Sequence, residues 1–184
     1  MTESAITQGW YVGCEHRPSP HFNQRPSGQV IDLLVIHNIS LPPGQFGSDD
    51  ISDFFLAKLV VERHPFFRQI KDLRVSAHCL VRRDGQVIQY VSFDHRAWHA
   101  GVSNFAGRDN CNDFSIGIEM EGTDDCLYTD EQYLALTQLT RQLQQKYPQI
   151  SEDRITGHSD IAPGRKTDPG PAFDWPRYKA LISV

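Results

Sequence analysis

The sequence contains no long hydrophobic run, no excess of basic residues and no closely spaced cysteine pair. Its longest apolar runs, such as residues 31–36 with Asp32 inside, fall far short of the roughly 20 residues of a transmembrane helix. With 18 Lys and Arg against 23 Asp and Glu, the net charge of −5 predicts no basic surface for nucleic acid. We therefore expect a protein that binds neither membrane nor nucleic acid.

Export signals are also missing from the sequence. The first residues, MTESAITQGW, have neither a positively charged start nor an apolar core, so we expect a cytoplasmic location. The four cysteines are widely spaced and form no C-x-x-C pair: Cys14, Cys79, Cys111 and Cys126. In a reducing compartment this spacing predicts free thiols rather than disulfides or a zinc knuckle.

Length and hydrophobic periodicity predict one domain, residues 1–184, of the α/β class. Asp84-Gly85 between two apolar runs predicts a β-hairpin, and Thr129 with Gln132 predicts a capped helix start. The predicted strands are 33–36, 75–81, 86–91, 115–120 and 154–156, and the predicted helices are 51–61, 129–147 and 175–182. We expect them to form a central mixed β-sheet flanked by helices.

Three segments lack regular periodicity. Residues 1–30 contain three prolines and are predicted to form a surface arm, and residues 62–71 are predicted to be irregular. Residues 45–69 belong to a long connection, and long connections in compact domains are commonly functional. This segment is therefore a candidate mobile cover over the site.

Residues 157–171, GHSDIAPGRKTDPGP, combine an imidazole, an ammonium and a carboxylate with six Gly and Pro residues. Gly and Pro interrupt both helical and strand periodicity, so we predict a shaped loop that is neither helix nor strand. Such a loop would hold His158, Lys166 and Asp168 at defined angles. Active sites are often built this way, although a surface loop with scattered polar residues is the alternative interpretation.

Polar residues also occur where buried strands are predicted. His37 and Asn38 follow the apolar run 33–36, at the end of a strand where α/β sheets present functional groups. Glu119 and Glu121 lie two positions apart and therefore share one face of their strand. Acidic residues in a buried strand require a reason. His78, by contrast, is interpreted as a core histidine that hydrogen-bonds to backbone.

This inventory of side chains suits a metal hydrolase. Two neutral imidazoles and one carboxylate leave a fourth position on zinc for water, whose pKa falls to about 7 when it is bound, and a further carboxylate can accept its proton. Lys166 could stabilise the developing oxyanion. The spacing alone does not prove that these residues converge, because they are far apart and no H-E-x-x-H motif is present.

Long motifs in the chain resemble the AmpD type of N-acetylmuramyl-L-alanine amidase, from about Trp10 to the C-terminus. They are VIHNISLPPGQFG, RVSAHCLVRRDGQVIQYV, RAWHAG, CNDFSIGIEMEG and TGHSDIAPGRKTDPGPAFDW. The resemblance implies the fold shared with T7 lysozyme and the peptidoglycan recognition proteins. It also implies a zinc enzyme that cuts the amide between 1,6-anhydro-N-acetylmuramic acid and L-alanine in the recycling of cell-wall fragments.

Individual roles follow from the resemblance. The metal ligands would be His37, His158 and Asp168, with Glu119 as the base and Lys166 as the oxyanion stabiliser. The resemblance also points to three contacts for the sugar and stem peptide: Asn38, Arg74 and Trp98. The expected partner is thus a small molecule, an anhydromuropeptide, and the expected oligomeric state is a monomer.

Two positions depart from the family pattern. Phe66 stands where some relatives have a tyrosine, and Asn110 stands where a basic residue can occur, a loss that Arg108 could compensate. Two other hypotheses stay open. A non-catalytic peptidoglycan-binding module of the same fold would lack a ligand or the base, and a structural zinc protein would favour four ligands rich in cysteine.

Overall fold

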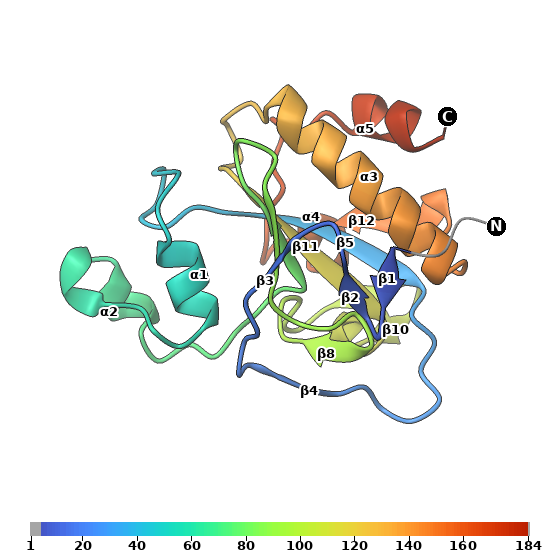
Figure 1. Ribbon diagram of the computed structural model, residues 1–184, viewed down its shortest axis with the longest axis horizontal. Helices are drawn as coiled ribbons and strands as arrows, with labels where there is room; N and C mark the ends of the chain where they lie inside the picture. Colours follow the sequence, from blue (N-terminus) through green and yellow to red (C-terminus); the bar gives the residue numbers. More distant parts are fainter. Residues whose placement is uncertain (1–4, 184) are drawn as a thin grey trace.

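A six-stranded mixed β-sheet forms the centre of the protein in this computed structural model, which describes residues 5–183 (Figure 1). The order of its strands is β12 (Ile155–Gly157), β5 (Leu33–Ile39), β11 (Ser115–Glu121), β6 (Cys79–Val81), β7 (Val87–Gln89) and β3 (Glu15–His16). The first four strands in this order run parallel, β7 is antiparallel to β6, and β3 is parallel to β7. The predicted mixed sheet is confirmed.

The hairpin of β6 and β7 turns at Asp84-Gly85 as predicted, and Gly85 has the positive φ of 83° that favours glycine. Its strands are shorter than the predicted ranges 75–81 and 86–91. The backbone N–H groups of Tyr90 and Val91 both donate to the carbonyl of His78, at 2.8 and 3.5 Å. Because two residues of one strand lie opposite a single residue of the other, this is a β-bulge, and the regular pairing of β6 with β7 ends there.

Helices α3 (Asp130–Lys146) and α5 (Trp175–Ile182) cover one face of the sheet (Figure 1). Thr129 and Gln132 form the predicted capping box at the start of α3. The helices pack their apolar residues against the even-numbered residues of β5 and β11. This core includes Leu136, Leu139, Leu143, Tyr178, Leu34, Ile36, Ile116, Ile118 and Met120.

The candidate cover, residues 45–69, contains α1 (Asp50–Phe55), the 3₁₀ turn η1 (Val61–Arg63) and the start of α2 (Phe67–Ile70). The predicted helix 51–61 is wrong in length, because the chain leaves the helix at Leu56 and Ala57 adopts a φ of 58°. The predicted irregular stretch 62–71 likewise contains short helical turns. This part lies beside the sheet (Figure 1) and packs Phe55 and Phe67 into a second apolar cluster.

The N-terminal arm runs over the surface as expected, but it forms short strands: β1 (Ile6–Thr7), β2 (Trp10–Tyr11), β3 and β4 (Phe22–Gln24). β4 pairs with β8 (His95–Ala97). Arg25 attaches the arm to the domain, since its guanidinium donates to the backbone carbonyls of Phe93, Asn112, Asp113 and Ser115. These contacts lie far apart in sequence, so periodicity could not predict them.

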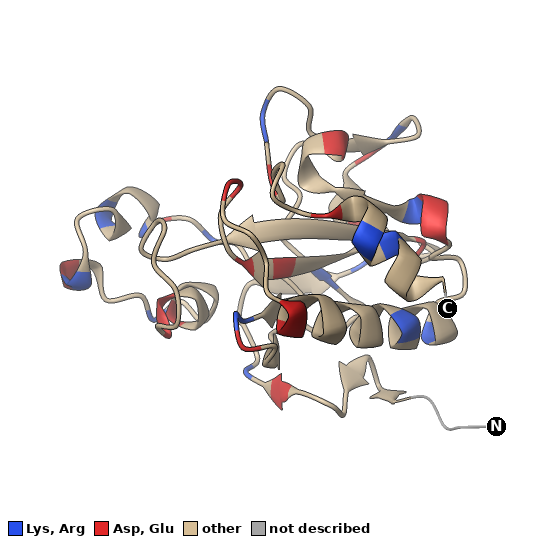
Figure 2. Ribbon diagram, turned by 90° about the horizontal axis from the view of Figure 1, so that it is seen from above, with Lys and Arg blue, Asp and Glu red and all other residues tan. Residues whose placement is uncertain are grey.

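The remaining short elements are β9 (Asn104–Phe105), β10 (Arg108–Asp109), η2 (Cys111–Asp113), η3 (Glu152–Arg154) and α4 (His158–Ile161). Basic and acidic residues are interspersed along the chain (Figure 2). Within residues 5–183, no helix combines the length and the apolar character needed to cross a bilayer.

Candidate active site

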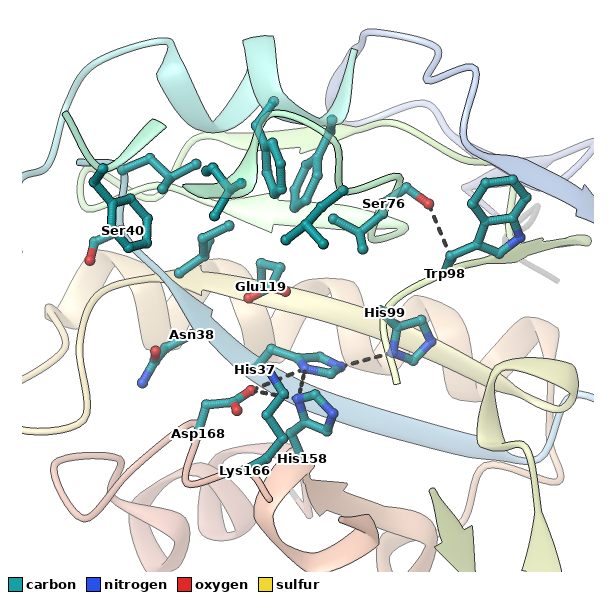
Figure 3. A pocket seen from close by; sticks show the side chains of 18 residues that line it. His37, Asn38, Ser40, Ser76, Trp98, His99, Glu119, His158, Lys166 and Asp168 are labelled. Atoms are coloured by element: carbon teal, nitrogen blue, oxygen red, sulfur yellow. Dashed lines mark hydrogen bonds and ion pairs between the residues drawn. The ribbon is translucent and has the colours of Figure 1, made fainter. Parts of the chain in front are cut away.

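Three potential metal ligands converge above the sheet face that α3 and α5 leave uncovered (Figure 3). The Nδ1 atoms of His37 and His158 lie 2.9 Å apart. The Oδ2 atom of Asp168 lies 3.1 Å from the first and 3.0 Å from the second. The convergence that the sequence could not establish is thus present in the structure.

Strand pairing brings the two imidazoles together. β12 runs parallel to β5, and Gly157 pairs with Ile36. The next residue in each chain segment is a histidine, so His158 and His37 lie side by side. The prediction that residues 157–171 contain no helix is wrong at its start, because His158 begins the one-turn helix α4. The Asp160 carboxylate accepts from the Gly157 backbone N–H at 3.0 Å and stabilises this turn.

Both imidazoles direct Nδ1 toward the centre and Nε2 toward the protein. The Nε2 of His158 lies 3.0 Å from the carbonyl oxygen of Ala100, an obligate acceptor, so this nitrogen carries the proton and Nδ1 offers its lone pair. The Nε2 of His37 faces Nδ1 of His99 at 2.9 Å. Burial lowers the pKa of His37 to about 4, which keeps it neutral.

The donor set suits zinc. Without a cation, the lone pairs of two nitrogens and a carboxylate oxygen would face each other at about 3 Å, an unfavourable arrangement. Ligand atoms about 2.0–2.2 Å from one tetrahedral zinc ion lie only slightly farther apart than this. Burial alone would raise the pKa of Asp168, but its close contacts with the imidazoles of His158 and His37 bring the pKa below its usual range, so the third group is anionic.

Glu119 and Glu121 share the same face of β11 but have different surroundings. Glu119 is buried, pairs in register with His37, and its Oε2 has no hydrogen-bond partner among the described residues. Burial raises the pKa of Glu119 well above its usual range, Asp168 adds to the rise and Lys166 opposes it. Glu121 instead accepts from the backbone N–H groups of Gly47 at 2.6 Å and Arg83 at 3.0 Å.

A cavity of about 350 Å³ opens in front of the three ligands. Seven of the eight predicted site residues line it: His37, Asn38, Trp98, Glu119, His158, Lys166 and Asp168. Its opposite wall is apolar. Phe54 and Phe66 of the candidate cover contribute to this wall, together with Ile70, Leu73 and Val75, which were not predicted at the site. The cavity therefore offers both a polar floor and an apolar side to a ligand.

The predicted contact residues lie at different places. The amide nitrogen of Asn38 donates to Asp124 Oδ1 at 2.8 Å and to the Pro169 carbonyl at 3.1 Å, which leaves only its oxygen for a ligand. Trp98 borders the cavity, and its indole N–H donates to Asn23 Oδ1 at 2.7 Å. Arg74 is exposed and lines an adjoining depression rather than the cavity itself.

The two departures from the family pattern also differ in position. Phe66 forms part of the apolar wall. Asn110 is exposed in a left-handed conformation, with φ of 59°, and does not line the cavity. Arg108, the suggested substitute, pairs with Asp32 at 2.7 Å and stacks on the ring of Phe114, so the structure does not place it at the site.

Residues 27–171 match the N-acetylmuramoyl-L-alanine amidase family (Amidase_2), and the chain belongs to that family. More specifically, it is 59% identical to the 1,6-anhydro-N-acetylmuramyl-L-alanine amidase AmpD of Salmonella typhimurium over 96% of this chain and 94% of AmpD. A crystal structure of an AmpD selenomethionine derivative superposes with a TM-score of 0.94, at 55% identity, and covers 96% of this chain and 98% of that one. The AmpD-type resemblance of the motifs is confirmed.

More distant structures extend the comparison. AmpDh3 from Pseudomonas aeruginosa, solved in complex with anhydromuramic pentapeptide, is 31% identical, with a TM-score of 0.64 over 85% of this chain and 61% of that one. The peptidoglycan recognition protein SD of Drosophila shares the fold, with a TM-score of 0.57 at 21% identity over 90% of this chain and 86% of that one. The expected fold class is therefore confirmed.

Proposed function

We propose that the chain is a zinc-dependent amidase that cuts the bond between 1,6-anhydro-N-acetylmuramic acid and the L-alanine of muropeptides, in the recycling of peptidoglycan. The observation that carries the proposal is the convergence of His37, His158 and Asp168 beside Glu119, which is buried and whose Oε2 has no hydrogen-bond partner among residues 5–183. The identity of 59% to an AmpD named for this substrate supports the choice of substrate.

In this proposal His37, His158 and Asp168 hold the zinc ion. Zinc bound there lowers the pKa of water and polarises the amide carbonyl. Three protein ligands leave a coordination position open, as catalytic sites require, whereas structural zinc sites are closed by four. The donor set therefore favours a catalytic role.

Glu119 moves the proton. Its carboxylate takes a proton from the water that attacks the lactyl carbonyl carbon, and then delivers this proton to the alanine nitrogen as the C–N bond breaks. The products are a lactyl carboxylate and a free peptide amine. Burial raises the pKa of Glu119, which makes its carboxylate a stronger base for this transfer.

Lys166 and the contact residues complete the site. The Lys166 ammonium, at the edge of the cavity, stabilises the negative charge that develops on the carbonyl oxygen. The face of Trp98 and the oxygen of Asn38 contact the sugar and the first residues of the peptide. Arg74 lies farther out, where a carboxylate of a longer stem peptide would reach it.

We further propose a cytoplasmic location. All four cysteines are free, and Cys79 and Cys111 are buried. Unpaired thiols fit a reducing compartment. Cell fractionation tests this part of the proposal, and recovery of the protein in an exported fraction would contradict it.

One experiment tests the activity and its metal together. The purified protein is assayed for zinc and incubated with an anhydromuropeptide, and the products are followed by mass. We expect one zinc ion per chain, release of the free peptide, loss of activity with a chelator and recovery with zinc. Asp168→Ala should lose both zinc and activity, whereas Asp125→Ala, an exposed carboxylate nearby, should keep the zinc.

The alternatives give different results in the same assay. A non-catalytic binding module would retain the muropeptide without changing its mass. A structural zinc protein would bind zinc but neither retain nor cleave the muropeptide.

A further inference from the structure

The imidazole of His99 lies directly on the backbone of β11. A Cβ atom built on Gly117 would lie 2.4 Å from Cγ and Nδ1 of His99, closer than any real contact allows. The glycine at this strand position therefore makes room for the His99 ring and is not part of a turn. The backbone N–H of His99 also donates to Asn112 Oδ1 at 3.1 Å, which fixes the residue from the other side.

Both ring nitrogens of His99 have partners. Nδ1 lies 2.9 Å from Nε2 of His37, and Nε2 lies 3.1 Å from the hydroxyl oxygen of Ser115 (Figure 3 shows the first contact). Ser115 and Gly117 belong to the same face of β11 as Glu119. The same face of β11 thus carries the proposed base, Glu119, and the residues that contact the ring of His99. This ring in turn contacts the predicted metal ligand His37.

The direction of these hydrogen bonds follows from the position of the ligand. Nδ1 of His37 faces His158 and Asp168, so it can bind a metal only when the proton is on Nε2. That Nε2–H then donates to Nδ1 of His99, the acceptor that the structure places against it. His99 in turn carries its own proton on Nε2 and donates it to Ser115.

We infer that His99 is a positioning residue that fixes the tautomer and ring orientation of His37, and that Ser115 does the same for His99. The inference rests on the proposed zinc site. The two ligand histidines differ in this respect, because His158 donates to the backbone carbonyl of Ala100, which no side-chain substitution removes. Support for His37 comes from a side chain and can be removed.

The test measures zinc affinity by competition with a chelator in four variants. His99→Leu removes the acceptor and should weaken zinc binding by about 10–100-fold, the usual effect of losing such a partner. His99→Asn can place its carbonyl oxygen near the position of Nδ1 and should restore most of the affinity. Ser115→Ala should give a smaller loss of affinity than His99→Leu, in a less perturbed fold.

His78→Gln is the matched control. His78 is another buried histidine on Gly117, whose backbone N–H donates to its Nδ1 at 3.0 Å, but it makes no hydrogen bond to the three ligands. This variant should be destabilised and yet bind zinc as the wild type does. An equal loss of zinc affinity in His78→Gln and His99→Leu would overturn the inference, because the effect would then come from general destabilisation.

A second measurement reads the tautomer directly. Long-range ¹H–¹⁵N NMR spectra of the zinc-loaded wild type should show His37 with its proton on Nε2, and the metal-free protein should keep this form only while His99 is present. An unchanged His37 tautomer in metal-free His99→Leu would overturn the inference. If the wild type bound no zinc at all, the proposed function would fail instead, so the two failures are distinguishable.

Discussion

On one face of β5 and β11, Leu34, Ile36 and Ile118 pack against α3; on the other, His37 and Glu119 line the cavity. The same two strands build both faces, because neighbouring residues of a strand point to opposite sides. The helix-covered face buries apolar side chains, which stabilises the fold. The cavity face buries ionisable groups, which costs stability unless they are paired or bind a metal.

This contrast shows how one strand can serve two purposes without conflict. In β11 the even-numbered residues Ile116, Ile118 and Met120 belong to the core, and the odd-numbered residues carry the polar and small groups of the site. Substitutions on the two faces should therefore separate catalysis from folding.

The largest effect is expected on the cavity face. Glu119→Gln removes the proposed base and should lower kcat by about 10²–10⁴. Zinc should be retained and melting little changed, because Oε2 of this buried carboxylate has no hydrogen-bond partner among the described residues. Glu121→Gln should leave most of kcat and instead lower the free energy of unfolding by about 1–3 kcal/mol, since it weakens the partly buried hydrogen bonds from the backbone of Gly47 and Arg83. Steady-state kinetics and urea unfolding measure the two. The reverse order of severity in kcat would assign the base to Glu121.

The helix-covered face should respond in stability alone. Leu136 is fully buried in α3, and Leu136→Ala should lower the free energy of unfolding by about 2–5 kcal/mol. Leu134, on the same helix, is 59% exposed, and Leu134→Ala should stay within about 0.5 kcal/mol of the wild type. Zinc stoichiometry below the melting transition should match the wild type in both. Loss of zinc from folded Leu136→Ala would mean that the two faces are coupled.

A smaller effect is expected at the start of α3. Thr129→Ala removes the capping box and should cost about 0.5–2 kcal/mol in urea unfolding. Thr137→Val is the contrasting variant, because the hydroxyl of Thr137 is buried and makes no hydrogen bond with any described residue. It should be neutral or stabilising. A Thr137→Val variant as unstable as Thr129→Ala would indicate an unrecognised partner.

The smallest effect concerns the protonation of His78, which changes the free energy of unfolding only at acidic pH. Burial, and then the charge of Arg25, hold its pKa well below the usual value of 6.5. Below about pH 6.5 the unfolded chain binds a proton that the folded chain does not, so this contribution to stability is present above that pH and is lost as the pH falls. With a chelator present, the free energy of unfolding should decrease more steeply for the wild type than for His78→Gln between pH 6.5 and 4.5. Parallel curves would contradict the buried neutral state.

Much of the fold could be predicted because its signals are local. The capping pair Thr129 and Gln132, the turn at Asp84-Gly85 and the helix at 175–182 all lie where the sequence placed them. The helix predicted to reach residue 61 failed because the turn at Ala57 has no Gly or Pro to mark it.

The candidate site, unlike the fold, could not be predicted from local signals alone. His37, His158 and Asp168 were proposed as a metal set from residue chemistry and family motifs, and the structure brings them together although 121 positions separate the first two. His99 was not predicted as support for His37, because its contacts to His37 and Ser115 depend on strand pairing. The one local signal was Gly117, a glycine inside a predicted strand, which indicates close approach of another group.

The register between β5 and β11 limits where the chain can tolerate insertions and deletions. Glu119 stands opposite His37, so deleting one residue from the first half of β11 would turn Ile118 toward the cavity and drive acidic groups into the core under α3. No single compensating substitution could restore both faces. The exposed loop around Ala106 and Gly107 has no such alternation of buried faces, so insertions and deletions should be tolerated there. In β11, by contrast, a shift of one residue would disrupt the candidate active site and the core together.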